Sequence, residues 1–198
     1  MASISHRAFI THRKRRIFIN NGNRTFDLPW IPKILKGILI RTDSLMFLRG
    51  KVFVVMVTQH VRHYTENNAP AIEWITRVKR ALNITFKEFD MHYVWVREHS
   101  SGDRQHYHWA LILDATRVSG VGWLFTYLQN VTEHCDMTVN IHFSKSYHLL
   151  KERDLEIGKW ERYYAFVHHA SYLAKLFTKT KRLRGTKSYD LSRLSFGS

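Results

Sequence analysis

The sequence predicts an α+β protein in which helices pack on one side of an antiparallel sheet. Two aromatic-rich segments, 91–98 and 105–114, are separated by only a short polar break, as in a β-hairpin. The segment 51–60 is dense in β-branched residues, which is typical of a central strand buried on both faces. Segments with helical spacing of apolar residues alternate with these strands, so the class is α+β.

A basic arm is expected to precede the sheet. Residues 1–49 are expected to form this arm and to include a short helix, with a short strand at 17–19. Residues 50–198 are expected to form the domain proper, which ends in a basic C-terminal tail. Apolar residues at helical spacing predict the helix of the arm: Ile31, Ile34, Leu35 and Ile38.

Two helices are expected between the strands of the domain. One contains Pro70 near its start and continues to about Leu82, and the other is capped by Ser119. The expected core face of the first consists of Ile72, Ile75, Val78 and Leu82. The expected core face of the second consists of Trp123, Leu124, Tyr127, Leu128 and Val131.

The last part of the chain is expected to add a strand over 137–143 and a helix over about 159–179. Between them, 144–158 is polar and is expected to form a loop with a helical turn. The resulting order is strand, helix, strand, strand, helix, strand, helix, which fits a sandwich of ferredoxin-like character.

The excess of basic residues indicates an anionic partner. Lys and Arg number 31 against 16 Asp and Glu, a formal charge of +15. Nucleic acid is favoured over a membrane, because no apolar run is long enough to span a bilayer and no basic amphipathic helix stands out. The residues expected to contact DNA lie in the arm and the tail: Arg13, Lys14, Arg15, Arg16, Lys179, Lys181, Arg182 and Arg184.

Two further observations restrict the class of protein. The single cysteine, Cys135, excludes an internal disulfide and suggests a reducing compartment, where it is expected to be a small buried side chain. The sequence has no Gly-x-x-x-x-Gly-Lys-Ser/Thr run, so no P-loop ATPase is expected within it.

A histidine pair on the second strand of the hairpin predicts a metal site. Side chains alternate along a strand, so His106 and His108 point to the same face, about 7 Å apart. Glu98 ends the preceding strand and can lie beside them, and Gln105 is an alternative third ligand. Two imidazoles and a carboxylate suit Mg²⁺, Mn²⁺ or Zn²⁺. A pair with this spacing can equally be the polar face of a strand.

A second pattern lies on the predicted last helix. Tyr172 and Lys175 are one turn apart, so their side chains are neighbours. An ammonium group beside a phenol favours the phenolate and can also pair with a phosphate oxygen. Taken alone, such a pair can equally be a packed tyrosine beside a solvated lysine. The polar stripe that contains the pair consists of Tyr164, His168, Tyr172, Lys175 and Lys179.

Together, the two patterns resemble the HUH family of single-strand endonucleases, the rolling-circle replication initiators. The segments that carry the resemblance are 105–111 (Gln-His-Tyr-His-Trp-Ala-Leu) and 170–175 (Ala-Ser-Tyr-Leu-Ala-Lys). With 96–98 (Val-Arg-Glu), they are similar to filamentous-phage (inovirus) replication proteins and prophage relatives of the YagK/YfjJ type. The resemblance covers about residues 50–198. Thr58-Gln59-His60 departs from the narrower group, which has an acidic residue there.

The resemblance implies an HUH endonuclease core and a metal-dependent enzyme that nicks and joins single-stranded DNA. Tyr172 would be the nucleophile that forms a phosphotyrosine intermediate, and Lys175 would position the phosphate. The Mg²⁺ or Mn²⁺ ligands would be Glu98, His106 and His108. Tyr163 or Tyr164 stays open as a second nucleophile.

The resemblance further implies initiation of rolling-circle replication of a phage, plasmid or prophage in the cytoplasm of a bacterial host. The substrate would be single-stranded or hairpin DNA at a replication origin, and a host helicase and polymerase would be partners. A DNA-binding regulator that no longer cuts and an HUH transposase are the alternatives. Aromatic side chains that either stack unpaired bases or pack in the core are Tyr93, Trp95, Tyr107, Trp109 and Trp123.

Overall fold

The computed structural model of the chain describes residues 3–20, 29–99, 105–118, 120–175 and 186–194. A five-stranded sheet lies at the centre of this part, with the strand order β6-β3-β5-β4-β7. The strands of the sheet are β3 (Lys51–Val61), β4 (Met91–His99), β5 (Gln105–Asp114), β6 (Thr138–Lys151) and β7 (Tyr189–Leu191).

The predicted α+β class and the ferredoxin-like order are confirmed. The chain runs from β3 through α2 (Ala69–Phe86) to the hairpin β4–β5, and then through α3 (Val121–Glu133) to β6. β5 lies between β3 and β4, and neighbouring strands are antiparallel throughout the sheet.

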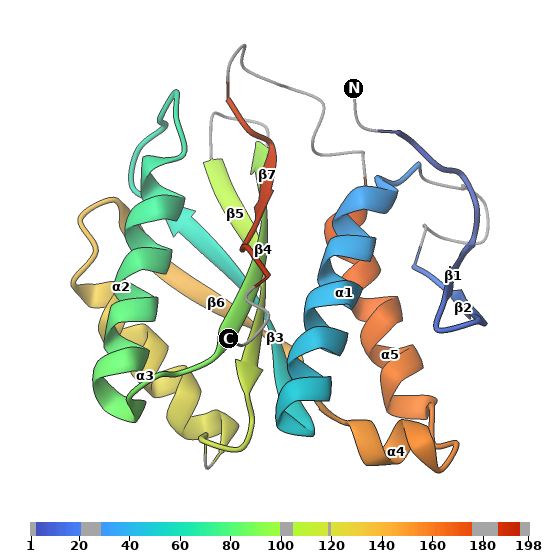
Figure 1. Cartoon of the computed structure of the whole chain (residues 1–198). Coiled ribbons are helices and arrows are strands. Elements are labelled where there is room, and N and C mark those ends of the chain that lie inside the picture. Colours follow the sequence, from blue (N-terminus) through green and yellow to red (C-terminus); the bar gives the residue numbers. More distant parts are fainter. Residues whose placement is uncertain (1–2, 21–28, 100–104, 119, 176–185, 195–198) are drawn as a thin grey trace.

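Helices cover both faces of the sheet, so the expectation of helices on one side was wrong. The sheet stands nearly edge-on in Figure 1, with α2 and α3 on one face and α1 (Pro32–Arg49) and α5 (Glu161–Ala170) on the other. The physical reason is that the strands are apolar on both faces. On β3, Val52 and Val54 belong to the hydrophobic cluster of α1 and α5, whereas Phe53 and Val55 belong to that of α2 and α3.

The N-terminal residues form part of the core rather than a separate arm. β1 (Phe9–His12) and β2 (Arg15–Phe18) make a hairpin whose Ile10 and Ile17 are buried. The helix α1 is 18 residues long, and its buried side chains share one cluster with the sheet and α5. The predicted boundary between residues 49 and 50 therefore falls between two elements packed in the same core.

The turn between β1 and β2 consists of Arg13 and Lys14. His12 pairs with Arg15 across the hairpin, and the two turn residues have positive φ angles of 47° and 59°. Two-residue hairpin turns of type I′ require positive φ at both positions. Arginine and lysine rarely adopt this conformation, so contacts outside the hairpin must support it.

Several predicted details of the helices need correction. Ile72 is 61% exposed on α2, where Ala71 and Trp74 are buried instead. On α3, Trp123 is 40% exposed and Thr132 is buried. The predicted cap of α3, Ser119, lies outside the described residues. A one-residue error in the phase of a helical pattern is enough to cause such exchanges between neighbouring positions.

The segment predicted as a loop at 144–158 is mostly strand and helix. β6 continues to Lys151, and α4 (Glu152–Glu156) follows it. Val55 pairs with Tyr147 and Val57 with Phe143, so three residues of β6 lie opposite one residue of β3. This bulge accommodates the polar segment 144–146, whose composition is what suggested a loop.

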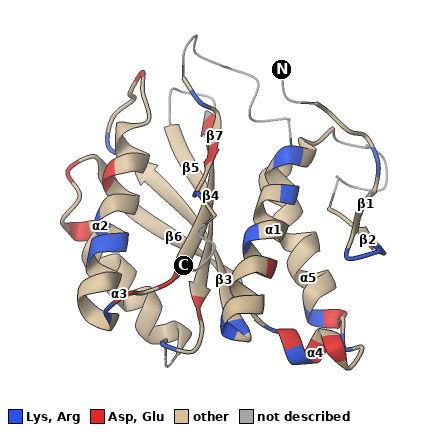
Figure 2. Cartoon of the chain, viewed as in Figure 1, with Lys and Arg blue, Asp and Glu red and all other residues tan. Residues whose placement is uncertain are grey.

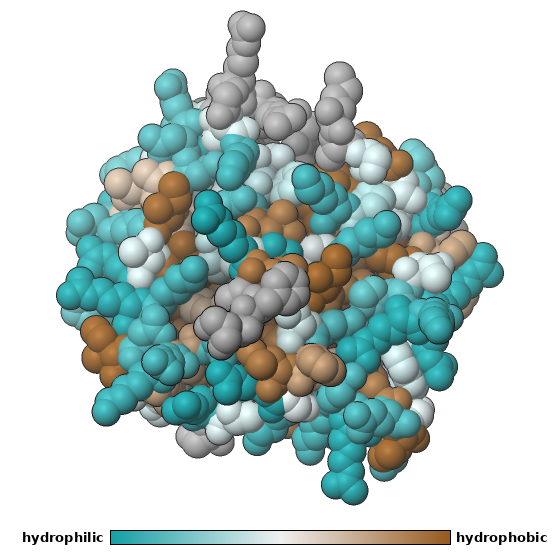
Figure 3. Space-filling view, in the orientation of Figure 1, coloured by the Kyte–Doolittle hydropathy of each residue, from teal (hydrophilic) through white to brown (hydrophobic). Residues whose placement is uncertain are grey.

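Charged residues are distributed over most of the helices and strands, and the turn of the β1–β2 hairpin is basic (Figure 2). The face seen in Figure 3 is mostly hydrophilic with separate apolar patches. Cys135 is buried, as expected. Among the described residues, no helix combines the length and the apolar character needed to cross a membrane.

Asp43 on α1 joins three elements of the α1–α5 layer. Its carboxylate accepts hydrogen bonds from His12 at 2.7 Å, from Arg13 at 2.8 Å and from the Tyr163 hydroxyl at 2.8 Å. Arg13 also forms a bidentate pair with Glu152 at 2.9 and 3.1 Å. Burial raises the pKa of Asp43, but the three hydrogen bonds outweigh burial and leave this pKa below its ordinary value.

Replacing Asp43 with asparagine is expected to lower the free energy of unfolding by about 1–3 kcal/mol at neutral pH, because Arg13 and Tyr163 lose a charged acceptor. A carboxyl group whose pKa is lower in the folded state stabilises the protein at pH values above its pKa in the unfolded state. This stabilisation is lost as the pH falls through the pKa of the folded state. The difference between wild type and Asp43→Asn should therefore shrink in acid. Urea unfolding at neutral pH and in acid measures this difference in the free energy of unfolding. Glu156→Gln, at an exposed glutamate, is the control. An unchanged difference in acid would contradict the assignment.

Candidate active site

The predicted triad of Glu98, His106 and His108 comes together on the hairpin β4–β5. Glu98 pairs directly with His106 in the strand register, and all three side chains lie on the face covered by α1 and α5. The Nε2 atoms of His106 and His108 lie 3.5 and 3.2 Å from Oε2 of Glu98. One ligand atom from each residue falls within 4.8 Å of the others, and this is the one such group of His, Cys, Asp or Glu among the described residues.

The surroundings of the triad fit a divalent cation. The carboxylate of Glu98 lies close to both imidazoles. Glu98 is 4% exposed, so little water surrounds its carboxylate. Thr58 Oγ1 lies 3.0 Å from His108 Nδ1 and orients the ring so that Nε2 faces Glu98. A ligand histidine is commonly held in this way through its other nitrogen. A carboxylate and two Nε2 atoms form a donor set that suits Mn²⁺, Mg²⁺ or Zn²⁺.

Tyr172 lies beside the triad. The last helix ends at Ala170, and the 3₁₀ helix η1 (Ser171–Ala174) places Tyr172 so that its ring stands edge-on to that of His108, with 6.1 Å between ring centres. The Tyr172 side chain is 45% exposed and can meet a ligand from solvent. The N–H of Ile31 donates to the carbonyl of Ala174 at 2.8 Å, which ties η1 to the start of α1.

Lys175 accompanies Tyr172, as the spacing predicted. Its Nζ lies over the Tyr172 ring, 4.9 Å from the ring centre. Burial lowers the pKa of Lys175 below its ordinary value, because desolvation disfavours the ammonium form. The expected helix over 159–179 is shorter in the structure, and residues 176–185 are outside the described part.

Gln105 does not compete for the metal position. It alternates to the opposite face of β5, where its amide donates to the Tyr107 hydroxyl at 2.7 Å and its carbonyl oxygen accepts from the N–H of Thr65 at 2.9 Å. The geometry therefore favours Glu98 over Gln105 as the third candidate ligand.

The two alternative tyrosines lie away from the triad. Tyr163 is 1% exposed and donates to Asp43, and burial together with that carboxylate raises its pKa far above the ordinary value. A buried phenol that holds its proton is unsuited to nucleophilic attack. Tyr164 lies about two helical turns before Tyr172, where Arg15 donates to its hydroxyl at 3.5 Å.

The sequence prediction assigned no role in the site to three polar residues around the triad. Thr58 orients His108, the ring of His60 lies 6.1 Å from that of His106, and His142 pairs with Thr58 across β3 and β6. Burial, and then the neighbouring histidines, lower the pKa of His60 and favour its neutral form. The alternation of side chains along 58–60 places Thr58 and His60 on the same face of their strand. It does not reveal which other strand pairs with these residues.

The predicted DNA contacts divide into three groups. Arg13 is engaged by Asp43 and Glu152 within the fold, so its guanidinium is less available to a phosphate. Lys14, Arg15 and Arg16 are exposed on the β1–β2 hairpin. The tail residues lie outside the described part: Lys179, Lys181, Arg182 and Arg184.

Most of the aromatic side chains proposed for base stacking belong to the core. Trp95, Tyr107 and Trp109 are at most 3% exposed, so they cannot meet a base. Tyr93 is partly buried and packs against the cluster beneath α2 and α3, and Trp123 is exposed on α3, so both lie on the opposite face from the triad.

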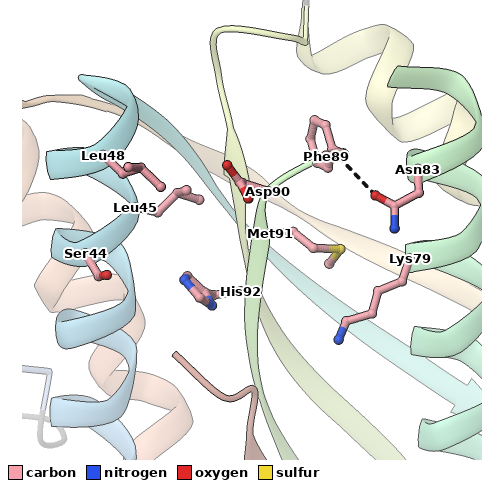
Figure 4. Close-up of a pocket in the computed structure, with 9 residues that line it drawn as sticks. All are labelled: Ser44, Leu45, Leu48, Lys79, Asn83, Phe89, Asp90, Met91 and His92. Carbon is pink, nitrogen blue, oxygen red and sulfur yellow. Dashed lines mark hydrogen bonds between the residues drawn. The ribbon is translucent and has the colours of Figure 1, made fainter. Parts of the chain in front are cut away.

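A separate pocket of about 190 Å³ lies at the start of β4, between α1 and α2 (Figure 4). His92 lines it and is 5% exposed, with Nδ1 at 3.3 Å from the Ser192 hydroxyl. Since Glu98 lies at the other end of β4, this pocket and the triad are different sites.

Replacing Thr58 with valine is expected to weaken Mn²⁺ binding about 10–100-fold, because His108 loses the partner that orients its ring. Isothermal titration calorimetry with Mn²⁺ measures the change, and His106→Ala should remove binding. The matched control is Thr76→Val, an exposed threonine on α2. Equal affinities for Thr58→Val and wild type would show that the ring needs no such support.

Comparison with known proteins places the chain in a family. The family model of the YagK/YfjJ C-terminal domain matches residues 40–198, which include the central sheet, the triad and Tyr172. Searches of the curated proteins and of the solved structures found no match. The match covers well over half of the chain and agrees with the similarity to prophage relatives of this type. The protein is therefore a member of the YagK/YfjJ C-terminal domain family.

Proposed function

We propose that the protein nicks and rejoins single-stranded DNA through Tyr172. The observation that carries the proposal is the position of this half-exposed phenol, edge-on to His108 of the triad and with Lys175 over its ring. A nucleophile, a cation and a candidate metal centre thus converge on one place where a phosphate can sit.

The proposed reaction exchanges one phosphate ester for another. The Tyr172 oxygen bonds to phosphorus and gives up its proton, while the bond from phosphorus to the 3′ oxygen breaks and that oxygen takes up a proton. The products are a 5′-phosphotyrosine and a free 3′-hydroxyl that a polymerase can extend. Because the phosphotyrosine conserves the ester bond, attack by a 3′-hydroxyl can reverse the reaction and rejoin a strand.

Each neighbouring side chain has a definite task in this proposal. Lys175 pairs with a phosphate oxygen beside Tyr172, and its lowered pKa eases exchange of a proton with the reacting oxygens. Thr58 keeps the His108 ring oriented. Mg²⁺ or Mn²⁺ held by Glu98, His106 and His108 would polarise the phosphate and stabilise its developing negative charge.

The proposed biological role is initiation of rolling-circle replication of a phage, plasmid or prophage in a bacterial cytoplasm. The formal charge of +15 and the membership in a family named for prophage-type proteins support a DNA substrate at a replication origin. The sequence carries no P-loop run, so unwinding and extension would come from a host helicase and polymerase.

Wild-type protein is expected to form a covalent adduct with single-stranded DNA from the replicon that encodes it, in the presence of Mn²⁺. Tyr172→Phe should abolish the adduct, because the phenyl ring keeps the packing and lacks the nucleophile. Denaturing electrophoresis of labelled DNA detects the adduct. Tyr147→Phe, which removes another half-exposed tyrosine, is the control.

A persistent adduct in Tyr172→Phe would move the nucleophile to another residue. If wild type forms no adduct with any fragment of that replicon yet still binds the DNA, the protein is a non-cutting DNA-binding regulator and the proposal fails.

Lys175→Met should slow single-turnover cleavage about 100-fold, because a charge that stabilises the reacting phosphate is lost. Lys175→Arg keeps a charge and should retain part of the rate. The exposed Lys159→Met serves as the matched control, and a loss of the same size there would show a general effect of charge.

A further inference from the structure

A cleft of about 750 Å³ lies between the N-terminal hairpin and α5. We call it the hairpin cleft. One wall comes from the end of β2, the other from α5, and His148 of β6 contributes to it as well. Its principal lining side chains are Arg16, Phe18, Asn20, His148, Tyr164 and His168.

The hairpin cleft combines exposed cations with exposed aromatic surface. Arg16 is exposed, and Phe18 is 70% exposed, which is unusual for a phenylalanine of a strand packed on a helix. Arg15 lies at the same rim, with its guanidinium 3.5 Å from the Tyr164 hydroxyl. No acidic residue is among the described residues that line the cleft. Cations that meet phosphates and rings that meet bases are what unpaired nucleic acid requires.

The polar groups described inside the cleft are uncharged. His148 Nε2 lies 3.0 Å from His169 Nδ1, and Ser144 Oγ lies 3.1 Å from His169 Nε2. Burial and the neighbouring His169 lower the pKa of His148 to about 4, so this pair is neutral at neutral pH. Positive charge is thus concentrated at the rim, while the interior offers neutral donors and acceptors.

The cleft leads to the candidate active site. The N–H of Asn20 donates to the Ser171 hydroxyl at 2.8 Å, which joins the wall of the cleft to η1. Tyr164, His168 and Tyr172 follow one another at intervals of four residues. Eight residues of helix span roughly 12 Å, so the cleft begins within a few nucleotides' reach of Tyr172.

We propose that the hairpin cleft binds unpaired nucleotides flanking the phosphate that Tyr172 attacks, with Arg16 on a phosphate and Phe18 against a base. The inference rests on the proposed function for the position of the cut. It adds a binding site whose outer wall, residues 15–20, lies ahead of the region 40–198 that the family match covers.

Binding is measured in the Tyr172→Phe background, where no cutting can follow, with a fluorescein-labelled oligothymidine of about twenty nucleotides. Arg16→Ala combined with Phe18→Ala should weaken binding about tenfold or more, because a stacked base and a phosphate contact are lost. Arg80→Ala combined with Phe47→Ala, which removes an exposed cation and an exposed aromatic ring elsewhere, should change affinity less than twofold. Thermal melting confirms that both double variants fold.

An abasic scan identifies the stacked base. The scan uses a single-stranded fragment of the replicon that wild type converts to the adduct, because its cut site fixes the register. One or two abasic positions should weaken binding to Tyr172→Phe but not to the variant that also lacks the Phe18 ring, since the partner of that base is then already absent. Equal affinity of the Arg16–Phe18 double variant and its control would overturn the inference. So would an equal loss on double-stranded DNA of the same length, which has no unpaired bases to stack.

The adduct assay separates this inference from the proposed function. Normal affinity of the Arg16–Phe18 double variant in the Tyr172→Phe background, and normal adduct yield when the same two substitutions are made in protein that keeps Tyr172, overturn the hairpin cleft and leave the role of Tyr172 intact. Loss of single-strand binding in that variant, with no adduct from wild type, supports the cleft as a nucleic-acid site and overturns the nicking reaction.

Discussion

The candidate site depends on paired strands that change from apolar to polar side chains at the same level of the sheet. On the sheet face toward α1 and α5, β3 changes from apolar to polar between Met56 and Thr58, and β5 changes between Ala110 and His108. Those residues are direct partners in the register, and β4 follows one step later with Glu98. A slip of one residue in any strand would turn its polar side chain to the opposite face and dismantle the group.

The helices of the same layer complete this arrangement. α1 and α5 cover the apolar part of the face, and η1 lies where the polar part begins, held by the bond between Ile31 and Ala174. Tyr172 is half-exposed for this reason: its neighbours Leu173 and Ala174 are buried under α1, and its own ring extends over the uncovered end of the sheet. The same packing that stabilises the fold thus positions the phenol.

Local patterns predicted the centre of the site well. Alternation along β5 placed His106 and His108 on one face, and the short hairpin made Glu98 their neighbour. Thr58 and His60 were out of reach, because β3 meets β5 through pairs about fifty residues apart, such as Thr58 with His108. Register between strands distant in the sequence is decided by the whole core and leaves little trace in either strand alone.

Composition misled the prediction where tertiary contacts override it. The polar and charged composition of 144–158 suggested a loop, yet a bulge takes 144–146 into β6, which continues to Lys151. The basic run at 13–16 suggested uniform contact with phosphates, yet Arg13 is used within the fold. The apolar positions on both faces of β3 were recognised, but a second helical layer was not inferred from them.

The turn at Arg13 and Lys14 has a consequence for the order of folding. Two non-glycine residues at positive φ make the isolated β1–β2 hairpin unfavourable, and two-stranded hairpins are marginal even with better turns. Its conformation is stabilised by Asp43 and Glu152, which are distant in sequence. We therefore expect the hairpin to assemble late, on a core that α1, the sheet and α5 have already formed.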